Sequence, residues 1–146
     1  MEVRRGYFQF RPAAGSASQV TPGQLRDFGE RYTAAWRSRD PQQVAAFFSP
    51  EASLAVNGEA PQHPIDVARA FMADFPDLHL AMDGVFDRDG RIEYHWTLTG
   101  THSGTGAKVR ISGFEQWIFG PDGLVLESQG HFDAADYRRQ LSSARP

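Results

Sequence analysis

The chain has 146 residues, 40% of them hydrophobic and 23% charged, with a formal net charge of -3. This length and composition predict one soluble globular domain, because disordered and membrane-spanning chains depart strongly from such averages. A negative charge without a basic segment argues against a nucleic-acid partner, since phosphate backbones are bound by clustered Lys and Arg. The absence of cysteine excludes disulfides, thiolate nucleophiles and cysteine-ligated metal sites.

No apolar run has the length needed to span a membrane, and the first residues lack the apolar core of a signal peptide. We therefore expect a cytoplasmic protein without a membrane partner. Small residues dominate positions 11–18, so residues 1–20 are predicted to form a flexible N-terminal arm. Residues 21–146 are predicted to form the single domain.

Three helices are predicted in the first half of the domain. Residues 21–24 have the pattern of a capping box with proline at the first helical position, and apolar residues then recur at three- and four-residue steps to about Arg39. A second, short helix is expected from Asp40 to Ser49-Pro50, and it would include Phe47 and Phe48. The third begins at residues 63–64 and ends before Pro76.

Four strand-like runs follow at residues 78–86, 91–100, 108–119 and 123–132, after a possible short strand at 54–56. Glycine-containing turns at hairpin spacing separate them, which predicts an antiparallel meander. In the second run, apolar side chains at 92, 94, 96 and 98 share one face. In the third, the apolar phase slips after Gly113, which predicts a β-bulge that bends the sheet. A bent sheet closed by helices leaves a concave pocket for a small ligand.

Several segments carry a resemblance to a known family: Tyr32-Thr-Ala-Ala-Trp36, residues 71–78, residues 94–104, Gly113-Phe-Glu-Gln-Trp117, and residues 122–127 with Asp133. Over about residues 25–141, the chain resembles the nuclear-transport-factor-2-like cone fold and, more narrowly, the SnoaL-like polyketide cyclase group. The resemblance implies an α+β cone, in which three N-terminal helices pack on a strongly bent antiparallel sheet that encloses a pocket. It covers cyclases, isomerases, epoxide hydrolases, dehydratases and non-enzymatic binding domains, and a fold alone does not choose among them.

The resemblance implies that Asp133 is a pocket aspartate that acts as acid and base in intramolecular aldol ring closure. Residues 125, 127, 129, 131 and 133 alternate onto one face of the last strand, and the resemblance places that face toward the cavity. Apolar walls would then raise the pKa of the Asp133 carboxyl. Two alternatives stay open: the polar row is a solvated sheet face, or Asp133 is the N-cap of a terminal helix over residues 134–141.

The other candidate site residues belong to the same predicted pocket. His131 and His102 are candidate catalytic residues, His102 as a loop residue at the mouth that polarises a substrate carbonyl, with a solvated loop histidine as the alternative. Candidate ligand contacts are Tyr32, Trp36, Trp96, Trp117 and Gln129, with core packing as the alternative for the helical pair Tyr32 and Trp36. No metal-ligand spacing, nucleotide-binding glycine loop or Gly-x-Ser-x-Gly elbow is present, so we expect neither metal nor cofactor.

Two hypotheses of different class follow. The first is a cofactor-independent lyase, isomerase or cyclase acting on a hydrophobic small molecule in the cone pocket. The second is a non-enzymatic small-ligand-binding module or a dimeric assembly module with the same fold. A homodimer is expected in either case, because polar residues at 93, 95, 97 and 99 leave a broad sheet face that the chain's own helices do not cover.

Overall fold

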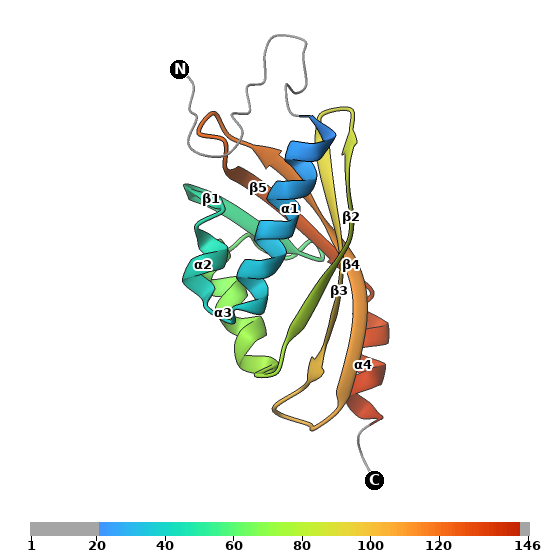
Figure 1. The fold of residues 1–146 in the computed structure, drawn as a ribbon. Helices are drawn as coiled ribbons and strands as arrows, with labels where there is room; N and C mark the ends of the chain where they lie inside the picture. The colour runs from blue at the N-terminus through green and yellow to red at the C-terminus, as the bar shows by residue number, and fades with distance from the viewer. Residues whose placement is uncertain (1–20, 144–146) are drawn as a thin grey trace.

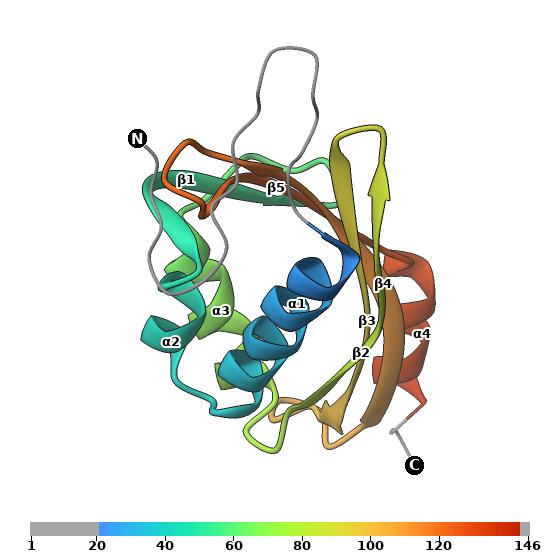
Figure 2. The same ribbon diagram turned by 45° about the horizontal axis from the view of Figure 1, so that its top comes forward.

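The computed structural model describes residues 21–143, and they form an α+β cone (Figures 1 and 2). In chain order the elements are α1 (Pro22–Arg37), α2 (Pro41–Ala45), β1 (Phe48–Val56), α3 (Pro64–Asp74), β2 (His79–Arg88), β3 (Arg91–Thr101), β4 (Lys108–Phe119), β5 (Val125–Phe132) and α4 (Ala134–Ser142). The strand order in the curved sheet is β1-β5-β4-β3-β2. The predicted fold class is confirmed, whereas the predicted arm over residues 1–20 lies outside the described residues.

Helix α1 begins where the sequence predicts. The amide of Gln24 donates to Thr21 Oγ1 at 3.1 Å, and the Gln24 side chain accepts from the amide of Thr21 at 2.9 Å. This reciprocal capping satisfies two donors that the first helical turn leaves without a partner. Helices α1, α2 and α3 lie within the curve of the sheet, and α4 lies on its other side (Figure 2). The buried face of α1 therefore forms part of the core.

The second helix is shorter than predicted, and the strand after it is longer. Helix α2 ends at Ala45, and Phe48 already belongs to β1, which continues through Pro50 to Val56. Strand β1 lies at the edge of the sheet, where a proline without an amide donor is tolerated. It pairs with β5 in parallel, so the sheet is mixed, while β2 to β5 form the predicted antiparallel meander.

The predicted β-bulge at Gly113 is wrong. Gly113 remains in continuous register with Trp96 on β3 and with Phe132 on β5. The register shifts lie elsewhere: between Met82 and Gly84 in the β2–β3 pairing, between Ile118 and Phe119 in the β4–β5 pairing, and between Phe48 and Ser53 in the β1–β5 pairing. The alternation of β4 is therefore unbroken across Gly113.

Gly113 has a packing role instead. A Cβ atom there would lie 2.2 Å from the carbonyl oxygen of His131 and 2.7 Å from Cζ2 of Trp96. The chain lacks a side chain at this position because β5 and the Trp96 indole come too close. Because the alternation of β4 continues past Gly113, Glu115 lies at an inward-facing position of this strand and is buried.

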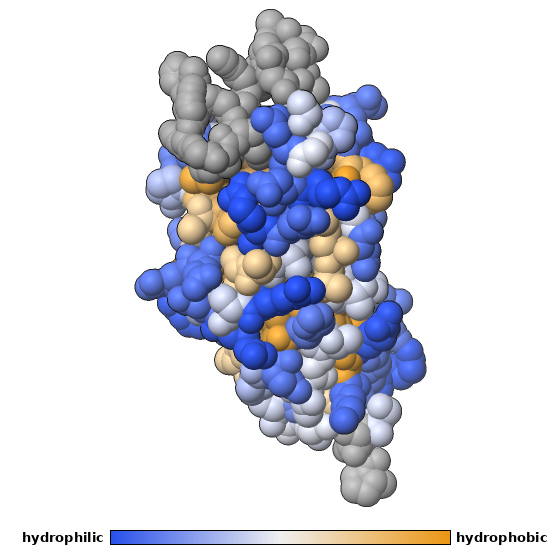
Figure 3. Space-filling view, in the orientation of Figure 1, coloured by the Kyte–Doolittle hydropathy of each residue, from blue (hydrophilic) through white to orange (hydrophobic). Residues whose placement is uncertain are grey.

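Aromatic rings fill the core between α1 and the sheet. The rings of Tyr94 and Trp117 stack at 5.0 Å between centroids, and Tyr32 meets Trp117 edge-on at 5.1 Å. The face of the molecule seen in Figure 3 is mostly hydrophilic, with apolar side chains visible only in separate small areas. Among the helices of residues 21–143, none is long and apolar enough to cross a membrane.

Candidate functional site

A cavity of about 50 Å³ lies between helices α1 and α3 and the inner face of the sheet. Its walls are mainly apolar and come from both helices and all strands: Trp36, Leu54, Val56, Val67, Phe71, Leu80, Trp96, Leu98, Glu115, Gly130, His131 and Phe132. Glu115 is the only carboxyl among these lining residues of the described chain. An apolar cavity with very few polar groups is the usual form of a small-molecule site.

Glu115 is held by hydrogen bonds from three other residues. Trp117 Nε1 and Ser128 Oγ both donate to Glu115 Oε1 at 2.8 Å. The Tyr32 hydroxyl donates to Oε2, also at 2.8 Å. Because the donors come from α1, β4 and β5, they fix the carboxyl in one orientation at the point where the helix meets the sheet.

Burial sets the acid–base behaviour of this group. Glu115 is 7% exposed, and the loss of hydration raises the pKa of its carboxyl, while the hydrogen bonds from Trp117, Ser128 and Tyr32 act in the opposite direction. Burial, followed by the nearby Glu115 charge, raises the pKa of the Tyr32 hydroxyl well above its ordinary value. Tyr32 therefore remains a proton donor in its hydrogen bond, and Glu115 is the group whose protonation can change.

Trp36 contributes a polar atom without a close hydrogen-bond partner. The residue is 6% exposed and lines the cavity, and its Nε1–H finds no close acceptor among residues 21–143. A longer hydrogen-bonding interaction from the Trp36 side chain to the Tyr32 hydroxyl lowers the pKa of that hydroxyl. The Trp36 indole therefore lies beside the Tyr32–Glu115 pair.

The structure places the four predicted aromatic contacts around this site. Trp36 and Trp96 line the cavity. Tyr32 and Trp117 are fully buried behind it, where they donate to Glu115. These residues pack in the core and also surround the cavity, so core packing and a place beside the cavity are compatible for Tyr32 and Trp36.

The polar row of β5 faces away from the cavity, which corrects the predicted orientation of that strand. Ser128 and Gly130 pair with Trp117 and Glu115, so they share the inner face. Gln129 and His131 belong to the opposite face, and the His131 ring lies against Phe114 with 4.9 Å between centroids. Although His131 is among the residues that line the cavity, its imidazole is directed to the other side of the sheet.

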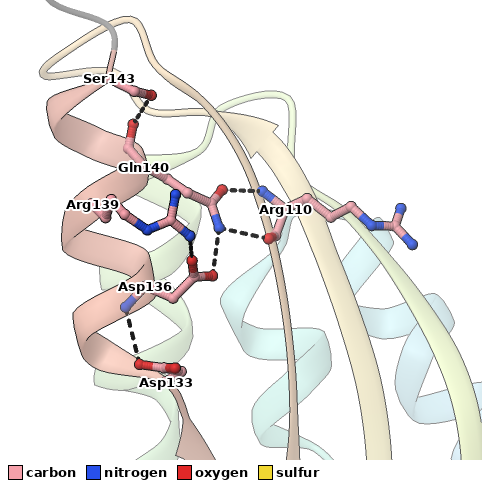
Figure 4. Close-up of polar contacts among 6 residues, drawn as sticks. All are labelled: Arg110, Asp133, Asp136, Arg139, Gln140 and Ser143. Atoms are coloured by element: carbon pink, nitrogen blue, oxygen red, sulfur yellow. Dashed lines mark hydrogen bonds and ion pairs between the residues drawn. The ribbon is translucent and has the colours of Figure 1, made fainter.

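Asp133 also lies outside the cavity. Its exposed side chain accepts from the amide of Asp136 at 3.0 Å and caps helix α4 (Figure 4). The same helix is fastened to β4 by Gln140, whose side-chain amide donates to the Arg110 carbonyl at 2.9 Å and accepts from the Arg110 amide at 2.8 Å. The expected inward orientation of Asp133 is thus corrected in favour of the helix-capping alternative.

His102 is likewise engaged in a local structure. Its Nδ1 accepts from the amides of Gly104 and Thr105, both at 3.2 Å, and its ring packs against Phe75. It is not among the lining residues. Within residues 21–143, no three His, Asp or Glu side chains come together in a way that could hold a metal ion.

Sequence reasoning missed Glu115 and Ser128. A signal for Glu115 was present, because strict alternation along 109, 111, 113, 115, 117 and 119 places position 115 on the buried face. The sequence analysis instead interpreted the change of pattern after Gly113 as a phase slip, and Glu115 was therefore not considered as a site residue. Ser128 gave no comparable signal, since a small polar residue in a strand is common on either face.

Comparison with known proteins places this architecture in a family. The sequence model of the SnoaL-like domain matches residues 29–128. No curated protein matches the chain at a significant level of sequence similarity.

Solved structures resemble the fold closely. AclR from Streptomyces galilaeus, provisionally described as a hydroxylase, is 20% identical with a TM-score of 0.71, over 86% of this chain and 100% of that one. A protein from Jannaschia sp. CCS1, provisionally described as a SnoaL-like polyketide cyclase, is 18% identical with a TM-score of 0.71, over 88% and 99%. IdmH from Streptomyces antibioticus, provisionally described as a polyketide cyclase, is 20% identical with a TM-score of 0.67, over 82% and 99%. Identities this low show a shared fold and no more.

Proposed function

From the premise that this chain belongs to the SnoaL-like domain family, we propose that it binds a hydrophobic small molecule and performs cofactor-independent acid–base chemistry of the lyase, isomerase or cyclase type on it. The observation that carries the proposal is one buried carboxyl, Glu115, with a raised pKa in the wall of an apolar cavity. A titratable group whose pKa is shifted by burial in a cleft is a typical mark of an active site. Glu115 takes the role that the sequence assigned to Asp133.

The chemistry begins with proton transfer from carbon. An ionised Glu115 oxygen takes a proton from a carbon that a neighbouring electron-withdrawing group has made acidic. Return of the proton to a different carbon gives an isomerisation, whereas attack of the carbanion on a second carbonyl closes a ring. Two of the similar structures carry the polyketide cyclase description, which favours the second outcome. The apolar walls keep water from competing for the proton.

The cavity volume limits the part of the ligand that enters. At about 50 Å³ it exceeds the roughly 10–15 Å³ that one water molecule needs. It is far below the roughly 300–1,000 Å³ of sites for drug-sized ligands. We propose that a small functional group reaches Glu115 and that larger ligands enter when the half-buried rings of Phe71 and Phe132 move apart. These two rings meet edge-on at the cavity wall with 6.4 Å between centroids.

Hydrogen–deuterium exchange of cyclopentanone in D₂O, followed by proton NMR, tests the proposal. The small ketone has acidic α-hydrogens, and the wild-type protein is expected to accelerate their exchange above the buffer rate. Glu115→Gln should lower this acceleration by about 100-fold or more, the usual contribution of a positioned base. Glu127→Gln is the matched control, because Glu127 is an exposed carboxylate on the outer face of β5.

Exchange at the buffer rate, or equal exchange in wild type and Glu115→Gln, would contradict the proposal. The non-enzymatic binding or assembly module would then be the better description. Near-ultraviolet circular dichroism of Glu115→Gln verifies that a loss of exchange does not come from unfolding.

We also propose that two copies associate through the outer face of the sheet. A row of rings crosses β2 to β5 there: Phe86 lies 5.4 Å from His95, which stacks on Phe114 at 5.1 Å, and Phe114 contacts His131. Phe86 is 42% exposed, the only exposed large hydrophobic side chain in the described part of the chain. A row of partly exposed rings on a sheet face that α4 covers only beside β4 is a common basis for symmetric pairing.

Light scattering coupled to size-exclusion chromatography tests this pairing. The wild-type chain should elute with twice its own mass at micromolar concentration, and Phe86→Asp should shift the mass toward that of one chain. Arg26→Asp, an exposed change on α1, serves as the control and should leave the mass unchanged. A single-chain mass for the wild-type protein would contradict the pairing.

A further inference from the structure

Helix α4 contributes no residue to the cavity wall of the described chain, but its Tyr137 packs on Phe132, which does line the cavity. We propose that α4 is a lid over the entrance of the cavity, with Tyr137 as its plug and Gln140 as its latch, and that Tyr137 limits the size of the ligands admitted. The inference rests on the proposed function, because it concerns access to the same cavity.

The exposure of the wall residues locates the entrance. Most of the side chains that line the cavity are buried, and the partly exposed ones are Val56, Phe71, His131 and Phe132. Val56 and Phe132 are the last residues of the paired strands β1 and β5, and Phe71 belongs to α3. The cavity therefore comes nearest to solvent between α3 and the ends of β1 and β5.

Tyr137 lies across this entrance. Its ring meets Phe132 edge-on with 5.8 Å between centroids, and it lies 6.3 Å from Phe75, the residue that caps the end of α3. Burial, followed by the nearby Asp74 charge, raises the pKa of the Tyr137 hydroxyl, so the side chain also reaches toward α3. Tyr137 thus supports the Phe132 ring from outside, while Phe71 meets that ring at the cavity wall.

Gln140 fastens the helix to an edge of the sheet. Strand β4 is longer than β5 at this end, because the last pair joins Gly113 with Phe132 and residues 108–112 extend beyond it. The Gln140 side chain makes both hydrogen bonds to the Arg110 backbone there, at 2.8 and 2.9 Å (Figure 4). A side chain therefore takes the place of a strand at this edge.

Few contacts hold α4 in this position. None of its nine residues is buried, and within the described chain Tyr137 and Leu141 are the two side chains of α4 that pack against the core. A helix of this length is marginal in water without tertiary contacts. Elements with few buried contacts and exposed hydrogen bonds open before the rest of a fold. Helix α4 can therefore leave the entrance while the sheet stays intact.

The cavity volume connects this opening to ligand size. At about 50 Å³ the closed cavity is smaller than the roughly 150 Å³ of an engineered apolar cavity that holds benzene. A ligand of that size consequently needs the open state. Its apparent affinity is reduced in proportion to the fraction of molecules that are open. Weakening the plug or the latch should therefore tighten its binding.

Binding of fluorobenzene, followed by ¹⁹F NMR, tests the lid. Tyr137→Ala and Gln140→Ala should each bind it about 10-fold more tightly than the wild type, because loss of a ring contact or of two exposed hydrogen bonds shifts an equilibrium by about that factor. Arg138→Ala is the matched control, since Arg138 is exposed on the same helix and this change keeps the plug and the latch. Near-ultraviolet circular dichroism verifies that each variant is folded.

Hydrogen exchange of the Arg110 amide tests the opening without any ligand. This amide donates to Gln140, so its exchange reports release of the latch. Tyr137→Ala should accelerate the exchange by the same factor by which it tightens fluorobenzene binding, because both quantities follow the open fraction. Arg138→Ala should not, and the amides paired between β3 and β4 should keep their wild-type rates in both variants.

Equal fluorobenzene affinities of the wild type, Tyr137→Ala and Gln140→Ala, or no binding to any of them, would overturn the lid. Unchanged exchange of the Arg110 amide in Tyr137→Ala would do the same. Glu115-dependent exchange of cyclopentanone alongside either result would leave the proposed function standing without this inference. Tighter fluorobenzene binding by both variants without any cyclopentanone exchange would support the lid and contradict the proposed chemistry.

Discussion

The two faces of strands β3 to β5 carry similar residue types and have opposite properties. On the inner face, Glu115 is buried, and three of its neighbours donate to it. On the outer face, the half-buried rings of His95, Phe114 and His131 stack across the strands. The same alternation positions both sets. A period of two thus separates the faces of a strand, and burial decides on which of them the pKa of a carboxyl is raised.

The largest expected effect comes from removing Glu115 on the inner face and, separately, Glu127 on the outer face. Glu115→Ala should lower the free energy of unfolding by about 3 to 5 kcal/mol, because buried donors on Tyr32, Trp117 and Ser128 lose their acceptor. Glu127→Ala, on the exposed outer face, should change it by about 0.5 kcal/mol or less. Urea denaturation measures both values. Similar losses for the two variants would remove the distinction between the faces.

The close contact at Gly113 gives the next largest effect. Gly113→Ala places a methyl group against the His131 carbonyl and the Trp96 ring, so it should cost about 1 to 3 kcal/mol or more through forced backbone movement. Gly130→Ala is the matched control in the neighbouring strand, because the nearest atoms to its Cβ would lie 3.7 and 3.9 Å away. Thermal unfolding of the two variants compares them. Equal midpoints would mean that β5 shifts freely beside Gly113.

The sequence predicted the local features of this fold well. The start of α1, the antiparallel meander and the inward face of β3 follow from capping residues, turn residues and alternation within short windows. The parallel pairing of β1 with β5 does not follow from such windows, because it joins residues that are far apart in the sequence, such as Ser53 and Glu127. The family resemblance gave the overall cone correctly.

The site was harder to predict than the fold. Position 133 lies one residue beyond the last strand, where a carboxyl serves equally well as a helix cap or as a pocket acid, and only the packing of α4 separates the two. Glu115 was concealed because a buried carboxyl in an apolar alternation is unusual. A binding site departs from the ordinary hydrophobic pattern by its nature, so a break in that pattern is itself a candidate for the site.

The pH dependence of stability probes the inner face through the raised pKa of Glu115. Between the ordinary value of 4.5 and the raised value in the folded protein, the folded chain keeps a proton that the unfolded chain has released. The free energy of unfolding therefore falls as pH rises through this window, by about 1.4 kcal/mol for each unit of pKa difference. The stabilisation is complete below the unfolded pKa and lost above the folded one.

Glu115→Gln supplies the reference for this measurement, since it lacks the titrating group while other carboxyls are unchanged. The difference in unfolding free energy between wild type and Glu115→Gln should decrease as pH rises from 4 to 8. An increase over that range would show that the hydrogen bonds from Tyr32, Trp117 and Ser128 outweigh burial and hold the pKa of Glu115 below its ordinary value.

Asp133 provides the smallest effect and the clearest contrast with Glu115. Asp133→Ala should lower the free energy of unfolding by about 1 kcal/mol, because the amide of Asp136 loses its cap. Asp133→Asn should cost less, since asparagine is also a good N-cap. Both variants should leave cyclopentanone exchange at the wild-type rate, because Asp133 is exposed and does not line the cavity. If Asp133→Asn instead lowered exchange as strongly as Glu115→Gln, the acid–base role would return to Asp133, and helix α4 would have to shift to bring that carboxylate to the ligand.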